Sequence, residues 1–200
     1  FNEKTLELVN RYYNKNRFDE IFQKAKEMGF TINMDLILGL PGETTNDILY
    51  TLQKTREYDM QNLTIHNLAI KRSSQLNKEN YTHVKNLNYK KIYSEIYSLT
   101  RSKELYPYYM YRQKNSFQWG ENIGYSVKDK ESIYNIEMIE ENKTVIGIGA
   151  GAITKLVTGE IGSEKIERII NPKDPLMWID ELHLRLENKK RKITEAIDGN

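Results

Sequence analysis

Apolar and polar residues follow two different periods along the first half of the chain. Three segments repeat their apolar residues every three to four positions, which predicts amphipathic helices: 18–28, 47–58 and 90–105. Two short apolar runs are typical of buried strands: 30–38 and 62–70. The resulting order of helix, strand, helix and strand favours parallel strands joined by crossover helices. We expect Asn16 to cap the first helix and Gly29 to end it.

The pattern changes after Pro107, where the segments become shorter. Residues 113–125 are expected to be irregular. Strands are expected in five segments, the last two forming a hairpin: 108–112, 132–139, 144–148, 153–158 and 165–170. Pro175 then opens a last amphipathic helix that runs to residue 196, with Asp174 as its cap. The chain is therefore predicted to be α/β in residues 1–105 and α+β in residues 106–200.

Composition narrows the class of protein. The chain has 200 residues, is 38% hydrophobic and 29% charged, and carries a net charge of only +2, which gives no reason to expect a general polyanion binder. No apolar run is long enough to cross a bilayer. It contains no cysteine, which excludes disulfides and cysteine-ligated metal sites within these residues. We expect a cytoplasmic protein with neither a nucleic-acid nor a membrane partner.

Asp35 is the most informative polar residue, because it interrupts an apolar strand in the carboxyl half of that strand. Burying a carboxylate is costly unless it meets a partner. In parallel α/β folds, ligands bind near the carboxyl ends of the strands. Asp35 could therefore bind ribose hydroxyls or an ammonium group. The alternative is a structural carboxylate that caps a loop or pairs with a lysine.

The next predicted strand raises the same question, because His66 and Asn67 interrupt it. Polar side chains there should be either satisfied within the core or functional. Lys71 and Arg72 follow at the exit of the strand, where they could pair with substrate carboxylates or form a solvated edge.

Two further stretches carry candidate binding residues. Basic, amide and aromatic side chains interleave between Tyr108 and Tyr125, which suits a tetrapyrrole carboxylate or an RNA base: Tyr109, Tyr111, Arg112, Gln113, Lys114, Asn115 and Trp119. The run IGIGAGAIT at 146–154 lacks the spacing of a dinucleotide or phosphate loop. Its glycines would allow a close backbone approach to a flat ligand or to another strand.

At this point the sequence resembles a known family. DLILGLPGET at 35–44 resembles the DLI-x-GLP-x-x-T block of the HemN-like radical SAM enzymes, the oxygen-independent coproporphyrinogen oxidases and their relatives. Residues 1–2 and 8–11 resemble the segment that follows the Gly-Val-Gln-Ser motif in that family, and IHNLAIKR and IGIGAGAIT match later blocks in the same order. PGET, NLTIHNLAIKR and YRQKNSFQWGENIGY are closest to the coproporphyrinogen dehydrogenase subgroup of HemZ type. The resemblance covers most of 1–155 and only weakly the remainder.

The resemblance implies the roles of four residues toward S-adenosylmethionine (SAM). Arg11 matches an arginine that contacts this cofactor, and Asp35 matches an aspartate on the fifth barrel strand that contacts it too. Ala69 matches a backbone contact on the sixth strand, and Ile153 an apolar contact with the nucleoside end. The glycines at 147–151 would then pack close to the cofactor, or simply pack strands. No catalytic residue is assigned.

The chain departs from the family pattern in lacking the three cysteines spaced C-x3-C-x2-C and the Gly-Gly-Thr block after them. The resemblance therefore implies the C-terminal part of an incomplete (β/α)6 TIM-like radical SAM barrel plus an α+β C-terminal extension that contributes to the site. The ligands of the [4Fe-4S] cluster would lie upstream. In the whole enzyme, the cluster would reduce SAM to a radical that removes hydrogen from the propionates of coproporphyrinogen III, leaving vinyl groups after loss of carbon dioxide.

This part alone is expected to be inactive and to self-associate through an exposed barrel edge. Two rival functions stay open at this stage. One is a haem chaperone or haem-binding relative of the same family without decarboxylase activity. The other is a tetrapyrrole- or RNA-binding module that uses the tyrosine-rich segment.

Overall fold

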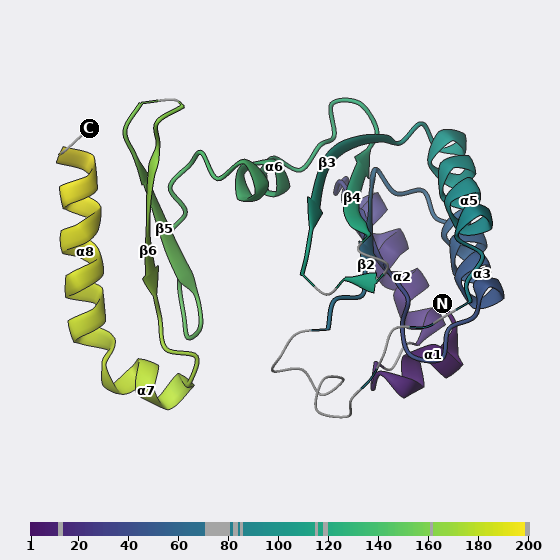
Figure 1. Ribbon diagram of the computed structural model, residues 1–200, viewed down its shortest axis with the longest axis horizontal. Helices are drawn as coiled ribbons and strands as arrows, with labels where there is room; N and C mark the ends of the chain where they lie inside the picture. Colours follow the sequence, from purple (N-terminus) through teal and green to yellow (C-terminus); the bar gives the residue numbers. More distant parts are fainter. Residues whose placement is uncertain are drawn as a thin grey trace. The chain divides into compact units, whose positions relative to one another are not determined.

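Figure 1 shows the computed structural model, which describes residues 1–11, 14–70, 81, 84, 86–114, 116–117, 120–160 and 162–198. The chain forms two compact units, Phe1–Ile133 and Tyr134–Asn200. None of the described helices is long and apolar enough to cross a membrane.

The first unit is built on one mixed sheet of four strands in the order β1-β2-β4-β3. The strands and helices of this unit are α1 (Glu3–Leu8), α2 (Lys15–Glu27), β1 (Asn33–Leu38), α3 (Thr45–Thr55), β2 (Asn62–Asn67), α5 (Tyr89–Ser102), β3 (Tyr106–Arg112) and β4 (Glu121–Ser126). β1 and β2 are parallel, as the sequence predicts. β4 runs antiparallel to β2, and β3 runs antiparallel to β4.

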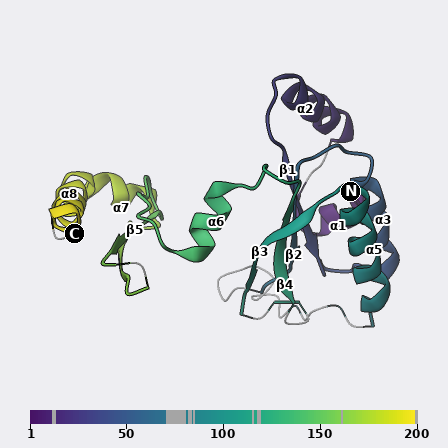
Figure 2. The same ribbon diagram turned by 90° about the horizontal axis from the view of Figure 1, so that it is seen from above.

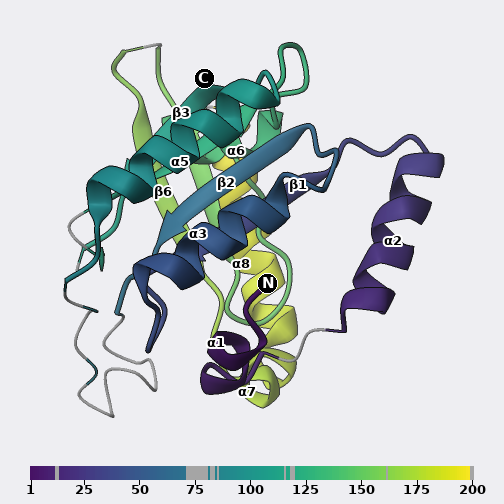
Figure 3. The ribbon, with the colours of Figure 1, turned by 90° about the vertical axis from the view of Figure 1, so that its right-hand side faces the viewer.

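Helices α3 and α5 cover one face of this sheet (Figures 2 and 3). Alternate residues of β1 point under these helices and are buried, while the residues between them are exposed. The apolar core between sheet and helices is formed by side chains of β1, β2, α3 and α5: Leu36, Leu38, Leu63, Ile65, Ile48, Leu52, Ile92, Ile96 and Leu99. In the register of the parallel pair, Asp35 lies opposite Thr64 and Ile37 opposite His66. The second face of the sheet is therefore the polar one.

The helix boundaries follow from their caps. The α2 helix begins one turn earlier than the prediction, because Asn14 and not Asn16 accepts the hydrogen bond from the Arg17 amide (3.0 Å). Gly29 ends it with φ 77°, as expected. At α3, Thr44 and Asp47 form a reciprocal capping box.

The second unit contains α6 (Ile133–Glu140), β5 (Ile153–Thr158), β6 (Lys165–Ile170), α7 (Pro175–Asp180) and α8 (Leu182–Asp198), with α6 beginning at the boundary. The predicted hairpin at 153–158 and 165–170 is confirmed in its bounds. The strand predicted at 132–139 is wrong, since those residues form α6. Residues 144–148 form no regular strand, although Val145 bridges Lys155. The last helix is capped by Asp174, as predicted, but divides into α7 and α8 at Glu181.

The predicted extension shares its sheet with the predicted barrel part. Residues 106–126 supply β3 and β4, which pair onto β2 within the first unit. The prediction that 113–125 is irregular is wrong for residues 121–125, which belong to β4. From the sequence, a barrel part is expected to end at residue 105 and an extension to begin at residue 106. This boundary stays a prediction.

Candidate functional site

Asp35 lies on the polar face of β1, with its side chain more than half exposed. Asn33 Nδ2 donates a hydrogen bond to Asp35 Oδ1 (2.7 Å). His66 Nε2 lies 3.8 Å from the same oxygen. Both neighbours therefore approach the same oxygen, Oδ1.

The electrostatics favour the ionised form of this carboxylate. The nearby His66 ring lowers the pKa of Asp35 below its ordinary value, against the opposing effect of desolvation, and the hydrogen bond from Asn33 adds to the lowering. The group is therefore an acceptor at neutral pH. An ionised acceptor makes hydrogen bonds about twice as strong as those of a neutral one.

Two tyrosines of β3 share the face of Asp35. Tyr109 Oη lies 3.2 Å from Thr64 Oγ1, and Tyr111 Oη lies 3.4 Å from His66 Nδ1. The two rings are nearly parallel, with centroids 6.4 Å apart. Gly124 of β4 makes this possible, since a Cβ atom there would come within 1.8 Å of the Tyr109 ring.

Arg11 joins Asp35 at an open cavity of about 450 Å³. Aromatic residues of α2, Phe18 and Phe22, and the polar Asn33 also line this cavity. The structure thus brings together two of the four residues assigned by resemblance, although 24 positions separate them in the sequence. A guanidinium group and a carboxylate in a common cavity suit a zwitterionic or hydroxylated ligand.

The other two assigned residues lie on other elements of the chain. Ala69 follows β2 and forms an antiparallel bridge with Ser116. Ile153 begins β5 in the second unit, where it pairs with Ile170 and is 48% exposed. Their roles toward a cofactor stay predictions.

Asn67 is a structural residue. It is 5% exposed, its amide nitrogen Nδ2 donates to the Glu121 carbonyl (2.6 Å), and its backbone amide donates to Asn122 Oδ1 (2.7 Å). These hydrogen bonds link the end of β2 to β4. Of the two alternatives for Asn67, the side chain is therefore the one satisfied within the core.

Several other candidates can be sorted by position. Lys71, Arg72, Asn115 and Trp119 lie outside the described residues. Arg112 pairs with Glu121 on the neighbouring strand (2.5 Å). Thr64 and Asn33 are the residues that sequence reasoning missed. The signal that could have identified Thr64 is its position opposite Asp35 in a parallel register.

The glycine-rich run supports close backbone packing within the second unit. A Cβ atom on Gly147 would come within 2.5 Å of the Ile153 carbonyl oxygen. Lys189 Nζ donates to the Gly147 carbonyl (2.8 Å), and Asn171 Nδ2 donates to the Gly149 carbonyl (2.7 Å). The run is therefore held by contacts from β6, α8 and the residue after β6.

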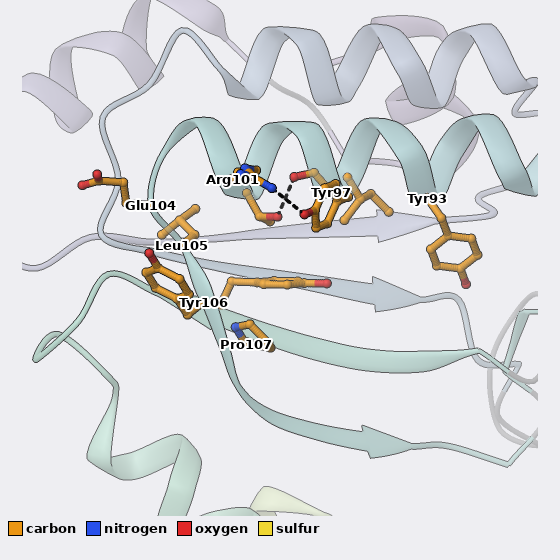
Figure 4. Close-up of a pocket in the computed structure, with 10 residues that line it drawn as sticks. Tyr93, Tyr97, Arg101, Glu104, Leu105, Tyr106 and Pro107 are labelled. Carbon is orange, nitrogen blue, oxygen red and sulfur yellow. Dashed lines mark hydrogen bonds between the residues drawn. The ribbon is translucent and has the colours of Figure 1, made fainter.

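A second cavity, of about 540 Å³, lies on the helix side of the sheet (Figure 4). Tyr93, Tyr97 and Arg101 of α5 line it together with Tyr125 of β4, and Arg101 Nη1 donates to Tyr97 Oη (2.9 Å). Tyr125 pairs with the buried Leu63 in the sheet register, on the face away from Asp35.

Glu43 stabilises the loop that follows β1. Its side-chain oxygen Oε2 accepts hydrogen bonds from the backbone amides of Gly39 and Leu40, both at 2.9 Å. Burial raises the pKa of this carboxyl to about 7, against the two hydrogen bonds that lower it. The loop beside the candidate site therefore contains a group that titrates near neutral pH.

The described residues contain no cluster of three or more His, Asp or Glu side chains that could hold a metal ion, and the sequence has no cysteine. The residues present therefore do not fit an iron–sulfur cluster.

Comparisons with known proteins show which proteins this chain is similar to. The chain is 37% identical over 200 residues to the oxygen-independent coproporphyrinogen-III oxidase-like protein HemZ of Bacillus subtilis, covering 98% of this chain and 39% of that relative. It is 36% identical over 70 residues to the oxygen-independent coproporphyrinogen III oxidase of Escherichia coli, covering 34% of this chain and 15% of that enzyme. No family model matches.

The fold agrees with these sequence relationships. Coproporphyrinogen III oxidase (HemN) from Escherichia coli, a radical SAM enzyme, superposes with a TM-score of 0.55 at 19% identity, over 77% of this chain and 36% of that one. The chain thus spans less than half the length of the relatives it matches. Its similarity in sequence to HemZ and in fold to part of HemN confirms the resemblance to the HemN-like radical SAM family that its motifs predict.

Proposed function

We propose that this chain is part of a radical SAM oxygen-independent coproporphyrinogen III oxidase, which converts coproporphyrinogen III to protoporphyrinogen IX in haem biosynthesis in the cytoplasm. The observation that carries the proposal is the common cavity of Arg11 and Asp35 in a chain that is similar to HemZ over nearly its whole length.

The side chains at this cavity fit SAM. The planar guanidinium of Arg11 can bind both oxygens of the amino-acid carboxylate. The ionised Asp35 can accept hydrogen bonds from the ribose hydroxyls through Oδ2. Ala69 would add a backbone contact, and Ile153 an apolar contact with the nucleoside. When bound, SAM would supply the radical chemistry, while these residues hold and orient it.

The iron–sulfur cluster that the family uses has no ligands in this chain, so its cysteines would come from other residues of the longer protein. We accordingly expect the 200-residue chain alone to have no oxidase activity. On the substrate side, the parallel rings of Tyr109 and Tyr111 present aromatic surface beside Asp35. Such surface suits a tetrapyrrole.

The deciding experiment uses the full-length protein that contains this chain. It is reconstituted with iron and sulfide and supplied with SAM, a reductant and coproporphyrinogen III. Product formation is measured by fluorescence after the product has been oxidised. Formation of protoporphyrinogen IX supports the proposal. Stoichiometric haem binding without any product would instead identify a haem chaperone or haem-binding relative.

A further inference from the structure

Asp35 is one of three side chains from three different strands that meet in a row. His66 comes from β2 and Tyr111 from β3, although 45 residues separate these two in the sequence. Tyr111 Oη lies 3.4 Å from His66 Nδ1, and His66 Nε2 lies 3.8 Å from Asp35 Oδ1. The imidazole therefore has one nitrogen toward the phenol and the other toward the carboxylate.

This order suits one tautomer of the ring. A phenol that donates to Nδ1 leaves the hydrogen of a neutral imidazole on Nε2. That hydrogen then faces the carboxylate oxygen. The reverse tautomer would place a lone pair against the ionised Asp35, which is unfavourable. The contact to Asp35 is long for a hydrogen bond, as polar contacts in ligand-free sites often are.

The packing around the phenol supports a fixed position. The Tyr109 ring lies nearly parallel to that of Tyr111 and seats against Gly124. Both phenols have a raised pKa, caused mainly by desolvation, so both keep their hydrogen at neutral pH. A neutral phenol held between a neighbouring ring and the sheet can keep donating to Nδ1.

From these contacts we infer that His66 and Tyr111 are positioning residues for Asp35. Tyr111 holds the His66 ring, and His66 Nε2–H holds Oδ1, so that Oδ2 points to the ligand. The inference rests on the proposed function, in which Asp35 binds the ribose of SAM. It adds two residues to those assigned by resemblance, and neither is required to touch the cofactor.

The test measures the affinity of the reconstituted full-length protein for SAM by calorimetry. Removing the donor with Tyr111→Phe is expected to raise Kd about threefold to tenfold, the effect of one hydrogen bond. His66→Ala should do the same or more. His66→Gln should stay within about twofold of the unmodified protein, because an amide can accept from Tyr111 and donate to Asp35.

The double variant Tyr111→Phe with His66→Ala separates positioning from general destabilisation. If the phenol acts through the imidazole, the double variant binds no more weakly than His66→Ala alone. Tyr125→Phe is the matched control, since it removes the same hydroxyl from the other face of the sheet and should leave Kd unchanged. Thermal unfolding of every variant checks the fold.

The affinity of Asp35→Asn for SAM distinguishes a failure of the positioning role from a failure of the Asp35 assignment. If Asp35→Asn weakens binding while Tyr111→Phe and His66→Ala bind SAM normally, the positioning role is overturned and the proposed function stands. If Asp35→Asn itself binds SAM with unchanged affinity, the assignment of Asp35 fails, and the positioning role fails with it. Additive losses in the double variant would also overturn it.

Discussion

The charge on Asp35 is stabilised by its neighbours in the absence of any ligand. His66 and Asn33 both favour the carboxylate over the carboxylic acid. A site prepared in this way spends little free energy on reorganisation when a ligand arrives. Substituting the carboxylate should therefore remove a charged hydrogen bond and leave the sheet intact.

We predict that Asp35→Ala in the full-length protein weakens SAM binding by about 1–3 kcal/mol, the scale of a charged hydrogen bond. Calorimetry measures the change. Asp59→Ala is the control, because Asp59 is an exposed carboxylate that pairs with Lys26. Equal affinities of the Asp35 variant and the unmodified protein would contradict the assignment.

The raised pKa of Glu43 leads to a prediction of how the stability of the chain depends on pH. Its folded-state pKa is raised from 4.5 to about 7, so its contribution to stability is fully present below pH 4.5 and is lost as pH rises through 7. The loss amounts to roughly 3 kcal/mol at most. Glu43→Gln keeps an acceptor for the two amides and should abolish this dependence.

Urea unfolding at pH 5 and pH 8 measures this effect. The unmodified chain should lose more stability between the two values than Glu43→Gln does. Glu57→Gln, on an exposed carboxyl that pairs with Lys54, should behave like the unmodified chain. Parallel pH profiles of the Glu43 variant and the unmodified chain would show that the carboxyl titrates normally.

At the scale of the elements, the pairing of β3 with β4 depends on one glycine. An alanine at position 124 would place its Cβ 1.8 Å from a Tyr109 ring carbon, so the ring has to move. We predict that Gly124→Ala lowers the free energy of unfolding by about 1–3 kcal/mol, as overpacking does. Denaturant unfolding provides the measurement.

Tyr109→Ala gives the control for this prediction. Added to Gly124→Ala, it removes the clashing ring, so the double variant should lose less than the sum of the two single losses. Simple additivity would mean that the glycine is needed for its backbone and not for the ring.

The same strand shows where sequence reasoning reached its limit. The apolar runs of β1 and β2 and the hairpin of β5 and β6 were predictable, because each has a clear period. In β4, one face consists of Asn122, Gly124 and Ser126, which pack on partners from β2 and β3. Such a strand is recognisable only once its neighbours are known. Residues 133–139 carry apolar residues compatible with both periods, which explains why a strand was expected where α6 forms.

The candidate site was predictable in part for the same reason. Asp35 and His66 stood out as polar residues within apolar strands. Tyr111 was one of several aromatic residues between Tyr108 and Tyr125, and no local feature distinguishes it from the others. Its contact with His66 exists because β4 inserts between β2 and β3, a pairing that no local pattern encodes.

At the scale of the molecule, the first unit has an unpaired sheet edge. β1 and β3 are the two outer strands, and β2 is the only partner strand of β1 among the described residues. An edge strand exposes backbone groups that can pair with another chain. We predict that the 200-residue chain alone associates in a concentration-dependent way, as judged by sedimentation velocity.

Ile37→Lys tests whether β1 is responsible. Ile37 is 40% exposed on this strand, and a charge at a sheet edge opposes strand pairing. The variant should remain monomeric to higher concentration than the unmodified chain. Leu184→Lys, at an exposed position of α8 in the second unit, is the control. A chain that is monomeric at every concentration would refute the prediction.

The strict alternation of β1 also determines which insertions the molecule can tolerate. One extra residue ahead of Asp35 would exchange the two faces of the strand. The carboxylate would then turn toward α3 and α5, and an apolar side chain would turn toward the face of His66. Two extra residues would restore the faces but displace Asp35 along the strand by about 6–7 Å, out of step with His66. Length variation among natural or designed versions of this protein should therefore be confined to its loops, and the spacing between Asn33 and Leu38 should be invariant.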